Sequence, residues 1–168
     1  MKARLAEASE TPDSNAAARV DLYLQPGRVF VSAQAVTVRT ILGSCVSVCL
    51  FDRELRAGGM NHYLLPNRIG SAATPTRFGP AALERLVAAM IEIGGRKSCM
   101  QAKVFGGARL LQPPGAAGAS DLGSKNVALA FDVLAAERIP VVAHDVGGSR
   151  GRQLLFQTDD GAAFVRRL

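Results

Sequence analysis

Residues 40–51 of this chain read TILGSCVSVCLF, and residues 58–65 read GGMNHYLL. The segment between them, DRELRA, is polar and charged apart from one leucine and one alanine. Two apolar runs joined by a short polar segment are typical of a β-hairpin. The stretch from 40 to 65 therefore predicts two paired antiparallel strands.

The register of this hairpin decides which side chains the two runs bring together. A turn centred between Arg53 and Glu54 pairs residues whose numbers sum to 107, and Cys45 then lies opposite His62. Directly opposed residues have Cβ atoms roughly 4.5–5.5 Å apart, close enough for a thiol and an imidazole to meet. A slip of one residue would put them on opposite faces, so the prediction depends on the turn. In this register Cys45 is a candidate nucleophile and His62 is its candidate base.

The two residues before the cysteine support a functional site. Gly43 and Ser44 allow the main chain to turn sharply ahead of the thiol, since glycine tolerates conformations that other residues avoid. Main-chain N–H groups freed by such a turn can stabilise an oxyanion, which makes Ser44 a candidate for that role. The alternative is purely structural: a buried cysteine in a strand and a core histidine with satisfied hydrogen bonds.

Five segments, in order along the chain, carry a resemblance to a known family: LGSCVSVC at 42–49, GGMNHYLLP at 58–66, AKVFGGA at 102–108, LGSKN at 122–126 and DVGGSRGR at 145–152. They resemble the CheD family, the chemoreceptor glutamine deamidases of bacterial chemotaxis. The resemblance runs from about residue 20 to the C-terminus, and its first two segments together are highly specific.

The resemblance implies an enzyme, a protein-glutamine glutaminase that hydrolyses selected glutamine side chains of methyl-accepting chemotaxis receptors to glutamate. It also implies a single-domain, layered α/β sandwich with mixed β-sheets, and a Cys-His-Thr triad. The cysteine and the histidine of that triad match Cys45 and His62. The threonine lies a few residues before the cysteine, which favours Thr40 and leaves Thr37 as the alternative.

The chemistry expected of such a site is acyl transfer to a thiol. The Cys45 thiolate attacks the carboxamide carbon, and a neighbouring imidazolium lowers the pKa of the thiol. His62 protonates the leaving ammonia and activates the water that hydrolyses the thioester, which contributes roughly 10²–10⁴-fold. Thr40 orients the imidazole, and N–H groups near Ser44 and Cys45 stabilise the oxyanion. A glutamyl methyl ester would form the same intermediate, so methylesterase activity is chemically open.

Length and composition favour one small cytoplasmic domain. The chain has 168 residues, 48% of them hydrophobic, and no apolar run approaches the roughly 20 residues that span a bilayer. Residues 1–18 read as a flexible polar tail without the apolar core of a signal peptide, which leaves 19–168 as the domain. The three cysteines, at 45, 49 and 99, cannot all pair within one chain, which favours a reducing compartment. With two histidines and no Cys-x-x-Cys, no metal or other cofactor is expected.

The charge of the chain bears on its partners. With 20 Lys and Arg against 14 Asp and Glu, the formal net charge is +6. A Glu-rich receptor helix is an acidic partner that fits this charge. Nucleic acid is another, but only 5% of the residues are aromatic and the arginines are scattered, so no nucleic-acid partner is expected. The main alternative function is a non-catalytic chemotaxis adaptor that binds receptors or a CheC-type phosphatase.

The remaining pattern predicts strands at both ends of the chain and two helices between them. Strands are expected at 20–24, 29–31, 102–105, 141–143, 152–157 and 162–166, the last two joined by a turn. The first helix opens at Pro80 and ends before Gly94, with an inward stripe of Leu83, Leu86, Val87, Met90 and Ile91. The second is capped by Ser124 and stopped by Pro140, with an inward stripe of Val127, Leu129, Ala130, Val133 and Leu134. Loops are expected at 67–77 and 112–118, and tight turns at the glycine-rich pieces 105–108 and 147–151.

Overall fold

The computed structural model describes residues 19–67, 74–109 and 122–168. The strands within these ranges are β1 (Val20–Tyr23), β2 (Val29–Ser32), β3 (Val36–Leu42), β4 (Val46–Asp52), β5 (Ala57–Asn61), β6 (Met100–Gly106), β7 (Val141–Val146), β8 (Arg152–Gln157) and β9 (Ala163–Arg167). The helices are α1 (Gly79–Glu92) and α2 (Leu122–Ala136), with the short 3₁₀ helices η1 (Pro75–Arg77) and η2 (Lys97–Cys99). The predicted tail at 1–18 and the loop at 112–118 lie outside the described residues.

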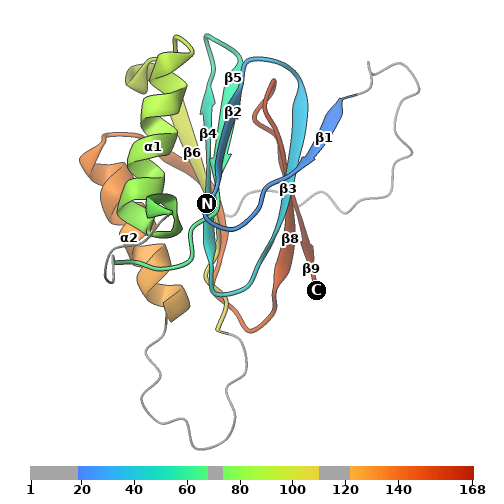
Figure 1. Cartoon of the computed structure of the whole chain (residues 1–168), viewed down its shortest axis with the longest axis vertical. Helices are drawn as coiled ribbons and strands as arrows, with labels where there is room; N and C mark the ends of the chain where they lie inside the picture. Colours follow the sequence, from blue (N-terminus) through green and yellow to red (C-terminus); the bar gives the residue numbers. More distant parts are fainter. Residues whose placement is uncertain (1–18, 68–73, 110–121) are drawn as a thin grey trace, which may run out of the picture.

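The strands form two sheets that pack face to face, and both α-helices lie on the outer face of one of them (Figure 1). The sheet that carries the helices has the strand order β2-β5-β4-β6-β7, and the other has the order β1-β3-β8-β9. Both sheets are mixed, because β1 is parallel to β3 and β6 is parallel to β7, while the other pairs are antiparallel. The predicted layered α/β sandwich with mixed sheets and two main helices is therefore confirmed.

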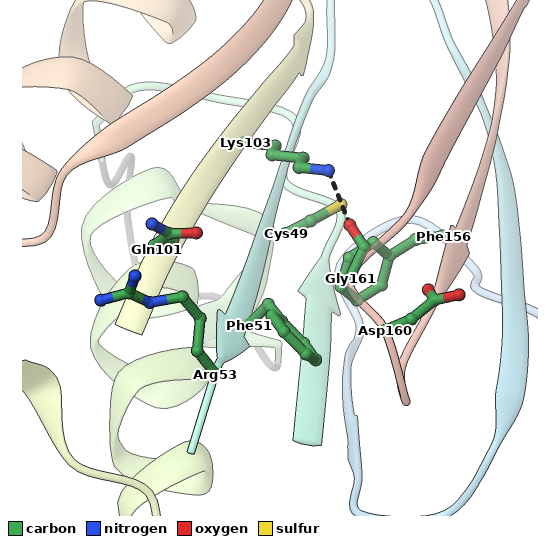
Figure 2. A pocket seen from close by; sticks show the side chains of 8 residues that line it. All are labelled: Cys49, Phe51, Arg53, Gln101, Lys103, Phe156, Asp160 and Gly161. Carbon is green, nitrogen blue, oxygen red and sulfur yellow. Dashed lines mark hydrogen bonds between the residues drawn. The ribbon is translucent and has the colours of Figure 1, made fainter. Parts of the chain in front are cut away.

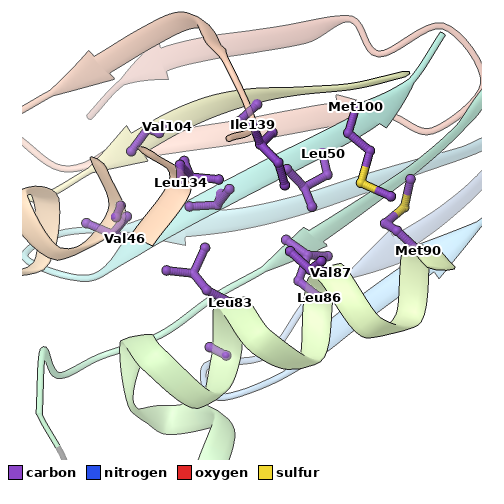
Figure 3. Packing of buried hydrophobic residues seen from close by; sticks show 14 of the residues in the cluster. Val46, Leu50, Leu83, Leu86, Val87, Met90, Met100, Val104, Leu134 and Ile139 are labelled. Carbon is purple, nitrogen blue, oxygen red and sulfur yellow. The ribbon is translucent and has the colours of Figure 1, made fainter. Parts of the chain in front are cut away.

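Two apolar cores separate the three layers. In the first, leucines of α1 and α2 pack on strand residues of the helix-bearing sheet, as Figure 3 shows for Leu83, Leu86 and Leu134 near Val46 and Leu50. The second core lies between the two sheets and includes Val38, Leu42, Met60, Leu154 and Phe156. Fully burying one such side chain contributes roughly 1.5–3 kcal/mol, so both cores stabilise the sandwich substantially.

Strand β4 contributes to both cores through alternate residues. Val46, Val48 and Leu50 belong to the core beneath the helices, whereas Cys49 belongs to the core between the sheets. This alternation follows from the two-residue period of a strand. Cys45 also packs on the core between the sheets, so it lies on the inter-sheet face.

The run at 40–51, which the sequence analysis treats as one strand, is two strands in two different sheets. Strand β3 ends at Leu42 in the four-stranded sheet, and β4 begins at Val46 in the five-stranded sheet. Residues 43–45 form the crossing between them. Apolar residues continue through both strands, so hydrophobicity alone does not reveal the break. Gly43 and Ser44 mark it, and the predicted sharp turn before the cysteine is therefore correct.

The helices begin and end close to their predicted positions. Pro80 lies in the first turn of α1, and Gly94, with φ of +99°, follows its end. Ile91 is an exception, because its side chain is 46% exposed and does not join the inward stripe. Ser124 does not cap α2 but lies within its first turn, since the helix already begins at Leu122.

Candidate active site

Cys45 lies where the chain crosses from one sheet to the other. It follows β3 and directly precedes β4. Its side chain is only partly buried, whereas those of Cys49 and Cys99 are buried, and all three cysteines are free thiols. Cys45 is therefore the most accessible of the three thiols.

The β4–β5 hairpin has a different register from the predicted one. Its paired residues have numbers that sum to 109 instead of 107, and the bridge between Val46 and Tyr63 continues this register. Cys45 and His62 are therefore diagonal neighbours, not directly opposed residues. Because the shift is by two, both side chains stay on the same face, the one between the sheets. Diagonal neighbours are roughly 7–8 Å apart, with Cβ atoms somewhat closer.

The turn of the hairpin explains the shift. The carboxylate of Asp52 accepts hydrogen bonds of 2.9 Å from the N–H groups of both Glu54 and Leu55. Such bonds from an aspartate to the next main-chain groups stabilise a turn. Asp52 pairs with Ala57, so the turn comprises four residues and is centred one residue later than predicted.

Thr40 and His62 meet across the two sheets. Thr40 lies on β3, and its Oγ1 is 2.8 Å from Nδ1 of His62. The same hydroxyl donates to the carbonyl oxygen of Leu24 at 2.9 Å. Because a hydroxyl has one proton, Nδ1 must donate in the contact with Thr40, so Nε2 carries the lone pair. Nε2 is buried and has no hydrogen-bond partner among the described residues, which leaves it available as a base.

The alternative threonine, Thr37, lies on the other face of β3. Buried residues alternate along this strand, and Thr40 is fully buried on the same face as Val38 and Leu42. Thr37 is three residues away from Thr40, so its side chain points to the opposite face. Thr40 is thus the threonine that the structure brings to His62.

Burial sets the charge of both reactive groups. Desolvation lowers the pKa of His62 to about 4, so its imidazole is neutral at neutral pH. Burial also raises the pKa of the Cys45 thiol, and the opposing effects of its own main-chain N–H and of Arg77 are smaller. Both shifts oppose the expected thiolate–imidazolium pair in the free protein. The site combines a neutral thiol with a neutral imidazole.

Ser44 enters the site through its main chain. Its carbonyl oxygen accepts a hydrogen bond of 3.0 Å from Nδ2 of Asn126 on α2. The same nitrogen donates to the carbonyl oxygen of Leu64, two residues beyond His62, at 2.9 Å. Asn126 is not among the site residues predicted from the sequence, although it ends the LGSKN segment that contributes to the family resemblance.

A cavity of about 270 Å³ opens farther along β4, between the two sheets (Figure 2). It is lined by Cys49, Phe51, Arg53, Gln101, Lys103, Phe156, Asp160 and Gly161. Nζ of Lys103 donates to the carbonyl oxygen of Gly161 at 2.7 Å, as the dashed line in Figure 2 marks. Burial strongly raises the pKa of the Cys49 thiol. With an unreactive thiol and no imidazole in its lining, this cavity is a poorer candidate than Cys45 for covalent chemistry.

In the part of the chain that the structure describes, the His, Cys, Asp and Glu side chains form no group of three or more that could bind a metal ion. None of the described helices combines the length and the apolar character needed to cross a membrane.

A thiol, an imidazole and a threonine hydroxyl on the facing sides of two sheets define the class: an α/β sandwich with a cysteine–histidine–threonine site. The family described as "CheD chemotactic sensory transduction" matches residues 64–167. A "Probable chemoreceptor glutamine deamidase CheD 1" of Anaeromyxobacter dehalogenans is 48% identical over 162 residues, 96% of this chain and 91% of the relative. Similarly named proteins of Trichlorobacter lovleyi and Rhodospirillum rubrum are 42% and 44% identical, over 86% and 87% of this chain and 89% and 81% of their own lengths. The chain belongs to the CheD family.

The two kinds of comparison differ in how they cover the candidate site. The family match begins at residue 64, after both Cys45 and His62. The alignment with the Anaeromyxobacter protein covers 96% of the chain, so it includes the segment that contains Cys45 and His62. The geometry around Cys45 and His62 therefore adds information that the family match alone does not contain.

Proposed function

We propose that this CheD-family protein is a chemoreceptor glutamine deamidase, a hydrolase that converts selected glutamine side chains of chemotaxis receptors to glutamate. One observation supports the chemistry most strongly. Thr40 accepts the hydrogen bond from Nδ1 of His62, which leaves a lone pair on Nε2, on the inter-sheet face that Cys45 shares. The relatives, each named as a probable chemoreceptor glutamine deamidase, indicate the substrate class.

The first proposed step is acylation of the cysteine. Sγ of Cys45 attacks the carboxamide carbon of the substrate as Nε2 of His62 takes the thiol proton. The carboxamide oxygen becomes an oxyanion, which the N–H groups of Ser44 and Cys45 stabilise. The imidazolium then gives its proton to the leaving nitrogen, the C–N bond breaks, and ammonia departs from a thioester. Thr40 stabilises the imidazolium because its oxygen accepts the Nδ1 proton.

The second proposed step is hydrolysis of the thioester. Nε2 of His62 takes a proton from a water molecule, whose oxygen attacks the thioester carbon. The C–S bond breaks, the thiolate of Cys45 recovers the proton from the imidazolium, and the product is glutamate. A glutamyl methyl ester would release methanol and form the same thioester, so methylesterase activity is part of the same proposal.

The proposed substrates are the cytoplasmic helices of methyl-accepting receptors, and a cytoplasmic location of the protein is part of the same proposal. A CheC-type phosphatase is proposed as a further partner on the basis of the family resemblance alone. The net charge of +6 is compatible with an acidic receptor surface.

Mass spectrometry of a receptor cytoplasmic fragment, before and after incubation with the protein, tests this function directly. Conversion replaces the NH₂ of a glutamine side chain by OH and releases ammonia. Cys45→Ala should abolish conversion, whereas Cys49→Ala should retain it when folded, because the Cys49 thiol is fully buried and its burial strongly raises its pKa, which makes it a poor nucleophile. Substantial conversion by Cys45→Ala would rule out the nucleophile. No conversion by the unmodified protein would favour the adaptor function.

A further inference from the structure

We propose that Asn126 is a positioning residue for the oxyanion site of Cys45. Its side-chain amide fixes the Ser44–Cys45 peptide so that the N–H of Cys45 faces the carbonyl under attack. This inference rests on the acyl transfer proposed above, and it gives a role to a residue that lies on a helix outside the cysteine–histidine–threonine set.

The orientation of the Asn126 side-chain amide is set by its hydrogen bonds. The residue is fully buried, and its Nδ2 donates to the carbonyl oxygens of Ser44 and Leu64. Because carbonyl oxygens only accept hydrogen bonds, the amide nitrogen must face them. Oδ1 is then left buried without a partner among the described residues. Burying an acceptor without a partner costs free energy. The two hydrogen bonds that Nδ2 donates therefore account for an asparagine at this buried position better than packing does.

The hydrogen bond from Asn126 also orients the Ser44–Cys45 peptide. Its geometry is trans and planar, as for all the described peptide bonds, so the carbonyl of Ser44 and the N–H of Cys45 point in opposite directions. The bond from Asn126 fixes the carbonyl and thereby sets the direction of the N–H. That N–H lowers the pKa of the Cys45 thiol, so it lies beside the sulfur. An oxyanion formed by attack of this sulfur would be within its reach.

The other carbonyls of the crossing segment are fixed as well. The carbonyl oxygen of Gly43 accepts from the N–H of Ala108, and that of Cys45 accepts from the N–H of Gly107, both at 2.8 Å. All three consecutive carbonyl groups at 43–45 therefore have partners, on α2 or in the turn after β6. The N–H groups of Ser44 and Cys45 point away from these partners. Fixed main-chain N–H groups next to the nucleophile are one requirement of an oxyanion site.

Glycines allow the turn and the helix to come this close to the cysteine. Gly106 and Gly107 have φ of +109° and +68°, a region that favours glycine. A Cβ on Gly106 would lie 2.2 Å from the carbonyl oxygen of Cys45, and one on Gly123 would lie 2.4 Å from that of Gly107. The phenol of Tyr63 also donates to the main-chain oxygen of Asn126 at 2.5 Å, which ties the first turns of α2 to the chain next to His62.

An experiment can distinguish the proposed positioning role of Asn126 from a merely structural role. Two reactions of the Cys45 thiol, acylation and alkylation, differ in whether they need an oxyanion site. Acylation of Cys45 by p-nitrophenyl acetate passes through a tetrahedral oxyanion, as deamidation does. Alkylation by iodoacetamide is a direct displacement at carbon and forms no oxyanion. Loss of an oxyanion donor should therefore slow acylation and leave alkylation nearly unchanged.

The experiment measures both rates at Cys45 by peptide mass mapping, together with receptor deamidation, in the full-length protein and in Asn126→Ala. Acylation and deamidation should both fall by at least about tenfold, up to the roughly 10²–10³-fold cost of losing one oxyanion donor, while alkylation stays close to the unmodified rate. Tyr63→Phe, which loosens α2 without touching Ser44, should produce a smaller change of the same kind and serves if Asn126→Ala does not fold. Thr158→Val is the matched control. It removes a different hydrogen bond from a buried side chain to a main-chain carbonyl, that of the Thr158 hydroxyl to Gln34, just beyond the end of β8. The ratio of the acylation rate to the alkylation rate should not change in this variant.

Equal losses of acylation and alkylation in a folded Asn126→Ala or Tyr63→Phe protein, or no loss of either, would overturn the inference. The small acyl donor makes the result independent of the receptor. If the unmodified protein fails to deamidate receptors but the acylation ratio falls as expected, the proposed function is wrong and the positioning role stands.

Discussion

The imidazole of His62 lies between two sheets, where Nδ1 bonds to Thr40 and Nε2 has no partner in the described part of the chain. Removal from water disfavours the charged forms of both the imidazole and the nearby thiol of Cys45. The proton therefore stays on sulfur until the substrate arrives. A neutral pair needs a base that accepts the proton during attack, and the free lone pair on Nε2 meets this need.

The pH dependence of Cys45 reactivity follows from this charge state. Alkylation of Cys45 should be slow at neutral pH and should accelerate with rising pH, because the thiolate forms only as pH approaches the raised pKa of the thiol. Deamidation kcat/KM should hold nearly constant from about pH 7 to about pH 5, because His62 gains a proton only near its pKa of about 4. His62→Ala should abolish deamidation but change alkylation little. Rapid alkylation that has already reached a plateau below neutral pH would show a thiolate–imidazolium pair instead.

Thr40 provides a second prediction at this scale. Thr40→Val keeps the shape of the side chain but leaves the buried Nδ1 proton of His62 without its acceptor. Turnover should fall by about 10- to 100-fold, less than for His62→Ala, since general acid–base catalysis as a whole contributes roughly 10²–10⁴-fold. The double variant should be little worse than His62→Ala, because residues that act as a unit are not additive. Full turnover by Thr40→Val would remove Thr40 from the mechanism.

At the scale of elements, β5 packs closely against the neighbouring strand and the facing sheet. It precedes His62 and contains Gly58 and Gly59. A Cβ on Gly58 would lie 2.9 Å from both the ring of Phe156 and the carbonyl oxygen of Thr158. A Cβ on Gly59 would lie 2.7 Å from the side chain of Val31, on the neighbouring strand. The glycines thus serve packing, and this packing fixes the position of the strand that leads to the histidine.

Gly58→Ala should consequently lower the free energy of unfolding by about 1–3 kcal/mol, the usual cost of overpacking a core. Chemical denaturation of the variant and the parent measures the difference. Gly151→Ala is the comparison and should cost less, because its added Cβ would lie farther from its nearest neighbour, 3.3 Å from the carbonyl oxygen of Leu42. Equal stability of Gly58→Ala and the parent would show that the sheets separate easily here.

Hydrophobic periodicity and turn residues predict both helices, the β4–β5 hairpin and the last two strands. These elements can be predicted because each one depends on residues that are close together in the sequence. The break at 43–45 was missed as a change of sheet because apolar residues continue across it. The register was wrong because one side chain, that of Asp52, decides the turn. Asn126 was missed because its bonds to Ser44 and Leu64 connect residues 82 and 62 positions apart, which no local pattern reveals.

At the scale of the whole molecule, the excess of positive charge is also present beside the site. The main-chain oxygen of Arg28 accepts from the N–H of His62 at 3.0 Å, and that of Arg77 accepts from the N–H of Leu64 at 2.9 Å. Both arginines are exposed. Arg77 also lowers the pKa of the Cys45 thiol, although burial outweighs it, so its charge lies near the sulfur. An acidic receptor helix that approaches Cys45 would meet these cations first.

Receptor binding should therefore weaken as ionic strength rises, while single-turnover deamidation of bound receptor should change little, because screening acts on exposed charges and not on the buried proton transfer. Arg77→Gln should reduce the slope of affinity against salt. Arg85→Gln makes the same change in net charge on α1, where Arg85 already pairs with Glu92 at 2.9 Å, and should leave that slope closer to the parent. Titration of a receptor fragment at several salt concentrations measures all three slopes. Equal slopes for the two variants would mean that the net charge, and not the position of the charges, steers the receptor. If the affinity of the parent does not change with salt concentration, charge has no part in binding.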